Sequence, residues 1–342
     1  MIPEDVLSFF DVNQGRRPKV LINLMVGKET VSSLFWGLNY EMLSYIDLWK
    51  QIDQTQFLKM VKEANKLGLL ITQDDKIFLT NAGQQKQISL GDLSSNALEL
   101  KLDEALDLFL LSSQVMSELS FKNSLYVPIN DDNRINFLVK RWFKSLKGDF
   151  VENRKMVLAY KDALKNVLSE LSDEDADLFI NYLPNHADSG MTIAQLARNL
   201  NLTQFQTELK LRIIFKKIFD VILSKEIYPL FDLIRPLLRE SILPDSVLQS
   251  WKLLQKGMSI QQVAKVKNIK ENTVKEHILT VAILKDQFPY EKFTIMSFEL
   301  PGRPETWKFE DAQKFDSRLT FFDFRLIQIK KIKDLQNDRS FR

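Results

Sequence analysis

Residues 257–278 read GMSIQQVAKVKNIKENTVKEHI, and this stretch decides the fold of the carboxyl-terminal part of the chain. Ser259 is followed three positions later by Gln262, the spacing of a capping box, in which each side chain hydrogen-bonds the backbone amide of the other residue. Apolar residues then recur with helical spacing, and Asn268 and Ile269 interrupt the pattern. The stretch therefore predicts a helix that begins after Ser259, a tight turn and a second helix.

The second helix has one apolar face, formed by Val274, Ile278 and Val281, and a polar face near its amino end. This arrangement is typical of a helix-turn-helix unit, whose second helix enters the major groove with its amino end toward the bases. Lysines there bind phosphates, whereas Asn and Thr hydrogen-bond base edges. The residues we expect to contact DNA are Lys267, Lys270, Asn272, Thr273, Lys275 and Glu276.

The basic charge of the chain is concentrated around this unit. The whole sequence of 342 residues has a net charge of only +2, too small to indicate a nucleic-acid partner by itself. Between residues 245 and 285, however, seven lysines oppose three acidic residues. This local excess favours phosphate binding by the predicted helix-turn-helix unit.

A second copy of the same pattern begins at Thr192. Thr192 and Gln195 have the capping-box spacing, and Asn201 turns the chain before a further apolar stripe. The outward residues of the following helix are polar but weakly charged, so this copy binds DNA, docks a protein or is purely structural. They are Thr203, Gln204, Gln206, Thr207 and Lys210.

Residues 19–85 predict a winged-helix-like domain. Apolar stripes with helical spacing lie at 31–38 and 57–64, and Gly68 suits the left-handed position that ends a helix. Two short strands follow, at 69–72 and 76–80, around a polar turn that would be the wing. Thr80 is expected to cap a further helix through the amide of Gly83.

The expected fold is mainly α, with a winged-helix-like domain that carries a small β-hairpin, a helical middle region and a carboxyl-terminal helix-turn-helix domain. Proline-rich or polar breaks near residues 128, 184, 244, 289 and 301 separate these regions. The expected segments are 1–92 (winged-helix-like), 93–184 (helical spacer bundle), 185–243 (central helix-turn-helix-like unit), 244–292 (helix-turn-helix) and 293–342 (extension with a basic helix).

Composition excludes several functional classes. The chain has no cysteine, which removes disulfides, thiolate metal sites and cysteine nucleophiles, and it has only two histidines. The first residues, MIPEDVLSFF, lack the basic region of a secretion signal, and no apolar stretch is long enough to span a membrane. We therefore expect a cytoplasmic protein without catalytic residues, cofactor or metal.

Other features have simple structural explanations. Gly27-Lys28 lacks the upstream glycine and the following Ser or Thr of a phosphate-binding loop. The acidic run 172–175 fits the start of a helix, and His277 fits a structural histidine. The basic residues of the last helix are expected to form a solvated face rather than a DNA contact: Arg325, Lys330, Lys331 and Lys333.

The stretch 257–278, with LQSWKLLQKG before it, resembles the helix-turn-helix domain at the carboxyl end of some RecQ-type helicases. It also resembles the domain that closes the YpbB-like proteins of low-GC Gram-positive bacteria, as do the amino-terminal region and FFDFRLIQIKKIKDL at 321–335. The shorter Thr273–His277 signature occurs in response regulators as well. Lys270 departs from this broad class, in which a Ser or Thr helix cap is common.

The resemblance to YpbB-like proteins implies a role beside a RecQ-like helicase in DNA repair or recombination, because the two genes are commonly neighbours. Our first hypothesis is therefore a non-catalytic, nucleoid-associated DNA-binding protein that acts with such a helicase. A sequence-specific transcription regulator is the second hypothesis. A scaffold whose helix-turn-helix units bind only protein is the third.

Overall fold

The computed structural model describes residues 1–89, 100–149, 152–294 and 296–340. In this part of the chain the structure is mostly helical with one small two-stranded sheet, which confirms the expected fold class. It divides into two compact units. Unit 1 contains Met1–Gly27 and Ser44–Glu240, and unit 2 contains Lys28–Leu43 and Ser241–Arg342.

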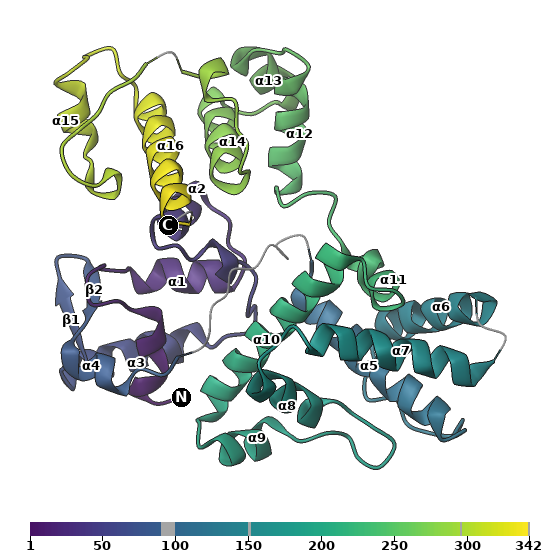
Figure 1. Ribbon diagram of the computed structural model, residues 1–342. Coiled ribbons are helices and arrows are strands. Elements are labelled where there is room, and N and C mark those ends of the chain that lie inside the picture. The colour runs from purple at the N-terminus through teal and green to yellow at the C-terminus, as the bar shows by residue number, and fades with distance from the viewer. Residues whose placement is uncertain (90–99, 150–151, 295, 341–342) are drawn as a thin grey trace. The chain divides into compact units, whose positions relative to one another are not determined.

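The amino-terminal part of unit 1 has the expected helix, hairpin and helix (Figure 1). Gly68, at a φ of +70°, ends the helix before the hairpin, and Asp74 and Asp75 form the turn between strands paired from Leu70–Leu79 to Gln73–Lys76. The Oγ1 atom of Thr80 accepts a hydrogen bond from the amide of Gly83, which confirms the predicted cap. The elements are η1 (Pro3–Phe9), α1 (Pro18–Met25), α3 (Gln54–Lys66), β1 (Leu70–Gln73), β2 (Lys76–Leu79) and α4 (Asn81–Lys86).

The rest of unit 1 is a helical assembly around aromatic side chains. Phe109, Phe179, Phe215 and Phe219 are buried and meet mainly edge to face, the arrangement that aromatic rings prefer. The break expected near residue 128 falls between two helices, as predicted. The helices are α5 (Leu102–Ser120), α6 (Asn133–Asp149), α7 (Asn153–Leu168), α8 (Asp173–Tyr182), α9 (Ile193–Leu200), α10 (Gln204–Lys225), α11 (Leu230–Ile234) and η4 (Arg235–Leu237); η2 (Leu43–Tyr45) spans the boundary at Ser44.

Unit 2 is built around α14, which α12, α13, α2 and α16 contact from several sides (Figure 1). The run from Ile278 to Leu284 contains no charged residue and is buried throughout. A helix that is apolar on every side must be surrounded, which explains this central position. The elements are α2 (Val31–Asn39), α12 (Asp245–Gln255), α13 (Ile260–Lys267), α14 (Glu271–Leu284), η5 (Tyr290–Lys292), η6 (Pro304–Thr306), α15 (Phe309–Gln313) and α16 (Phe321–Ser340).

One helix of the predicted winged-helix domain belongs to the other unit. The stripe at 31–38 does form a helix, α2, but its buried residues Leu34, Phe35 and Leu38 pack in unit 2. The segment predicted to be winged-helix-like, 1–92, therefore contributes this helix to unit 2. There α2 packs against α14 and α16, whose apolar residues cover its buried face.

The last helix, α16, is a core element rather than a solvated one. Phe324, Leu326 and Ile329 are buried within it, and Arg325 and Lys333 are themselves largely covered. Lys333 donates a hydrogen bond from Nζ to the carbonyl oxygen of Lys285, and burial lowers its pKa to about 8. The expectation of a solvated basic face was wrong for Arg325 and Lys333, because apolar residues lie on more than one side of α16.

The expected segment boundaries agree only partly with the two units. The boundary between 243 and 244 lies close to Ser241, where the carboxyl-terminal part of unit 2 begins. The boundaries after 184 and 292 fall inside unit 1 and unit 2. The boundary after 92 lies outside the described residues.

Candidate nucleic-acid interface

The turn between α13 and α14 has the predicted geometry. The amide of Ser259 donates to Oε1 of Gln262 over 2.7 Å, and the amide of Gln262 donates to Oγ of Ser259 over 3.2 Å. Asn268 adopts the left-handed conformation, with φ at 52°, and ends α13. The capping box and the turn therefore direct the chain from α13 into α14 as expected.

The amino end of α14 is open within unit 2. Lys270 stands at the N-cap without a side-chain cap hydrogen bond, in agreement with its departure from the common Ser or Thr. Among the predicted DNA-contacting residues, Lys270, Asn272 and Glu276 are exposed, whereas Thr273 and Lys275 are half-buried. Since the carboxyl-terminal half of α14 is surrounded, only this end can enter a groove.

Lys267 also has a structural contact. Its Nζ atom donates a hydrogen bond of 2.5 Å to the carbonyl oxygen of Ser246, which joins the end of α13 to the start of α12. Partial burial lowers the pKa of Lys267. His277 faces α12 and is hydrogen-bonded with Ser250, as expected of a structural histidine.

The central copy of the pattern has the expected first helix. Thr192 and Gln195 form a complete capping box, and Asn201 is left-handed at a φ of 53°. Its second helix differs from the prediction, because Gln206 and Thr207 are buried rather than outward. The signal was in the sequence: Thr203 and Gln206 repeat the same spacing and form another capping box at the start of α10.

The remaining outward residues of the central copy are mostly engaged inside unit 1. The Oγ1 atom of Thr203 donates a hydrogen bond of 2.6 Å to the buried carboxylate of Asp5. Lys210 forms ion pairs with Glu174 and Asp175, at 2.5 and 3.6 Å. Gln204 alone of the five predicted residues is exposed. The central copy therefore packs into the core of unit 1. Of the two copies, the carboxyl-terminal one keeps an open surface, at the amino end of α14.

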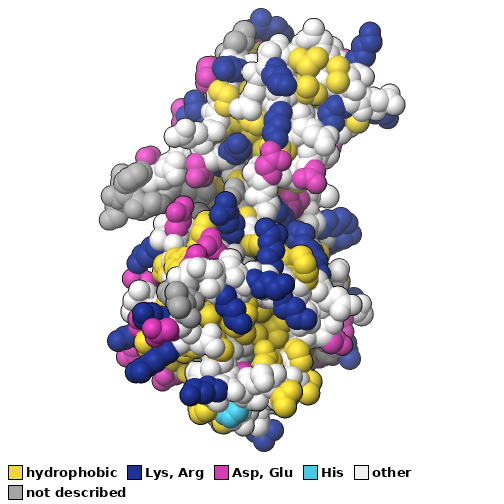
Figure 2. Space-filling model, turned by 90° about the vertical axis from the view of Figure 1, so that its right-hand side faces the viewer, with side chains coloured by type: hydrophobic (Ala, Val, Ile, Leu, Met, Phe, Trp, Pro, Cys, Tyr) yellow, Lys and Arg dark blue, Asp and Glu magenta, His cyan; other side chains and the backbone are white. Residues whose placement is uncertain are grey.

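A further exposed surface lies between α5 and α6 in unit 1, where the sequence was interpreted only as a spacer. Leu125 and Val127 are 89% and 85% exposed, and Gln114 fixes this loop by hydrogen bonds of 3.0 Å to the carbonyl of Val127 and 2.8 Å from the amide of Ile129. Figure 2, which views the side that carries α6 and α7, shows hydrophobic side chains next to a group of Lys and Arg. The signal in the sequence was a run of apolar residues in a segment without helical spacing.

Comparison with known proteins agrees with the helix-turn-helix assignment. Residues 246–301 match the protein family described as "Helix-turn-helix domain". Protein YpbB of Bacillus subtilis (strain 168) is similar to this chain, with 22% identity over 226 residues. The matched region covers 64% of this chain and 63% of YpbB, so the chain spans less than two thirds of that relative. No solved structure matches the chain.

Among the described residues, no group of three or more His, Asp or Glu side chains is placed to hold a metal ion. None of the helices in this part of the chain combines the length and the apolar character needed to cross a lipid bilayer.

Proposed function

We propose that this protein is a non-catalytic, DNA-binding accessory factor that contacts duplex DNA with the amino end of α14. The observation that carries the proposal is the exposure of Lys270, Asn272 and Glu276 at the end of a recognition helix whose other half is surrounded. Recognition helices contact DNA with this end. The match of residues 246–301 to a helix-turn-helix family supports the same conclusion.

The charges at this surface favour weak, sequence-tolerant binding. Lys267, Lys270 and Lys275 lie beside Glu271 and Glu276, so the local positive excess is small. Each phosphate contact made by a lysine releases counterions. It steepens the slope of the logarithm of the affinity against the logarithm of the salt concentration by about 0.9. A few such contacts suit a non-catalytic protein that accompanies an enzyme along DNA.

The test is the binding of the full chain to labelled duplex and forked DNA over a range of salt concentrations. Lys270→Ala combined with Lys275→Ala is expected to weaken binding and to lower the salt slope by up to about 2. Lys308→Ala, at an exposed position of unit 2 outside α14, is the control. Binding that is indifferent to salt and to the double substitution would refute the proposal. A strong preference for one duplex sequence would support the transcription regulator instead.

The partner that we propose is a RecQ-like helicase, in DNA repair or recombination at the nucleoid of a bacterial cell. This part of the proposal follows from the resemblance of residues 248–278 to a domain found on some RecQ-type helicases. The surface between α5 and α6 is a suitable docking site, because a groove of about 480 Å³ there is lined by apolar residues and bordered by lysines. The lysines Lys122, Lys140 and Lys147 have no ion pair among the described residues, so the groove fits an acidic, amphipathic segment of the partner.

Binding to a purified RecQ-like helicase of the same organism tests this surface. Phe143→Ser and, separately, Lys140→Glu change residues that line the groove and are expected to weaken the complex while DNA binding is retained. Leu158→Ser on α7 is the control, since Leu158 is also partly exposed but does not line the groove. No complex with the helicase, or equal affinity of all variants, would contradict the proposed partner or surface.

A further inference from the structure

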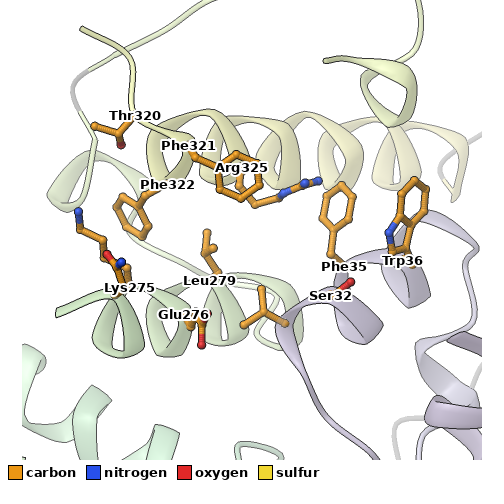
Figure 3. Close-up of a pocket in the computed structure, with 12 residues that line it drawn as sticks. Ser32, Phe35, Trp36, Lys275, Glu276, Leu279, Thr320, Phe321, Phe322 and Arg325 are labelled. Carbon is orange, nitrogen blue, oxygen red and sulfur yellow. The ribbon is translucent and has the colours of Figure 1, made fainter. Parts of the chain in front are cut away.

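A pocket of about 490 Å³ opens directly beside the recognition face of α14 (Figure 3). It lies between α2, α14 and α16 of unit 2, and Asn272, Lys275 and Glu276 contribute both to its wall and to the proposed DNA surface. This volume is in the range of sites that hold small molecules. A group held in the pocket would therefore lie next to any DNA bound by α14.

The walls of the pocket are aromatic. Phe35 and Trp36 come from α2, and Phe321 and Phe322 come from α16. Phe321 is 52% exposed, although most large apolar side chains of unit 2 are buried. An exposed aromatic ring beside a nucleic-acid surface suits the stacking of an unpaired base, since every base presents a planar face.

A cation without a carboxylate partner points into this pocket (Figure 3). The guanidinium carbon of Arg325 lies 3.7 Å from the ring centroid of Phe35, and its Nη1 atom donates a hydrogen bond of 2.8 Å to Oε1 of Gln328. Among the described residues no carboxylate forms an ion pair with it. Burial lowers the pKa of Arg325 to about 10. Because buried cations are usually paired, this arrangement leaves a place for an anion.

We propose that the pocket binds a nucleotide, with its base against the exposed ring of Phe321 and its phosphate at Arg325. This inference rests on the proposed function, because the expected ligand is an unpaired nucleotide at the end or branch of a duplex held by α14. A free mononucleotide has the same chemistry and is the alternative ligand. Glu276 repels a phosphate but accepts hydrogen bonds from an exocyclic amino group. The phosphate therefore lies at Arg325 on α16, and an edge of the base that carries an amino group faces Glu276 on α14.

The experiment compares a blunt duplex with the same duplex carrying a single-stranded end that contains the fluorescent base 2-aminopurine. The wild-type chain is expected to favour the single-stranded end by at least about fivefold and to quench 2-aminopurine by stacking. Phe321→Ala and Arg325→Gln should abolish the preference but leave blunt-duplex affinity unchanged. Phe315→Ala and Lys330→Gln, an exposed ring and an exposed lysine outside this pocket, are the matched controls. Phe321→Ala keeps the test valid if Arg325→Gln fails to fold.

Calorimetry with deoxyadenosine monophosphate distinguishes the two sources. Binding of the mononucleotide that Phe321→Ala removes supports the free nucleotide, whereas a preference confined to single-stranded ends supports the DNA strand. If the protein binds the blunt duplex but shows neither a preference for single-stranded ends nor binding of the mononucleotide, the pocket proposal is wrong and the proposed function is unaffected. Mononucleotide binding without duplex binding would refute the proposed function and support the pocket.

Discussion

Nδ1 of His277 lies 2.7 Å from Oγ of Ser250, so the middle of α14 is fixed to α12. Burial lowers the pKa of His277, and the nearby charge of Lys267 lowers it further. The imidazole therefore resists protonation in the folded protein. One of the contacts between α14 and α12 therefore involves a neutral histidine.

This contact predicts a loss of stability in acid. The unfolded chain binds a proton at the usual histidine pKa near 6.5, whereas the folded chain binds it only at lower pH. Between those two values the unfolded state holds more protons, so the free energy of unfolding falls as the pH drops below about 6.5. Urea unfolding near neutral pH and in mild acid measures this change.

His277→Gln is expected to reduce the acid sensitivity, because Gln retains a hydrogen bond to Ser250 without titrating. His186→Gln changes the other histidine of the sequence and should leave most of the sensitivity in place. Equal acid sensitivity of His277→Gln and the wild type would contradict the prediction.

The uncapped start of α14 predicts a conflict between stability and binding. Lys270→Ser supplies the missing cap, since the N-cap backbone is already extended at φ −73° and ψ 149°. We expect this variant to be about 1 kcal/mol more stable than Lys270→Ala. Both variants should lose DNA affinity to the same extent, because both remove the positive charge.

Thermal unfolding and DNA binding of these two variants provide the measurement. A Lys270→Ser protein no more stable than Lys270→Ala would mean that the start of α14 is satisfied in another way. A difference in DNA affinity between them would mean that the residue contributes more than its charge.

The central helix-turn-helix copy predicts effects on stability but not on DNA. Thr203→Ala removes the hydrogen bond to the buried Asp5, and we expect a cost of about 1–3 kcal/mol. Gln204→Ala, at the exposed position of this copy, should change neither stability nor DNA affinity by a measurable amount. Weaker DNA binding by a folded Gln204→Ala protein would restore this copy as a DNA contact.

Local signals in the sequence predicted local structure well. The capping boxes at Ser259 and Thr192 and the turns at Asn268 and Asn201 were predicted because each depends on residues only a few positions apart. The hairpin was predicted for the same reason, with its first strand one residue earlier than β1 (Leu70–Gln73).

Contacts between distant segments were not predictable in this way. A stripe such as that at 31–38 indicates that a helix is buried, but it does not name the helix that covers it. The candidate pocket depends on such contacts, because Phe35 and Arg325 meet only after α2 has joined α16. The run at 278–284, which has no charged residue and only Thr280 as a polar one, was the available signal that α14 needs partners on every side.

A buried lysine marks the place where the chain returns to unit 1. Nζ of Lys216 donates hydrogen bonds to the carbonyl oxygens of Ser44 and Ile46, and its side chain is almost fully buried. Burial lowers its pKa to about 8 from 10.5, although Asp220 and Asp47 oppose this shift. Between these two values the unfolded chain holds more protons, so the wild type gains stability as the pH rises, by up to about 3 kcal/mol.

Lys216→Met keeps most of the side-chain volume and removes the titrating group, so this gain should disappear from the variant. Other groups titrate in the same range, and the informative quantity is therefore the difference in unfolding free energy between wild type and variant, measured in urea from about pH 7.5 to about pH 10. That difference should shift in favour of the wild type as the pH rises. A constant difference would mean that Lys216 titrates at the same pH in the folded and unfolded chains, which is incompatible with an amine whose burial in unit 1 outweighs the opposing effect of Asp220 and Asp47.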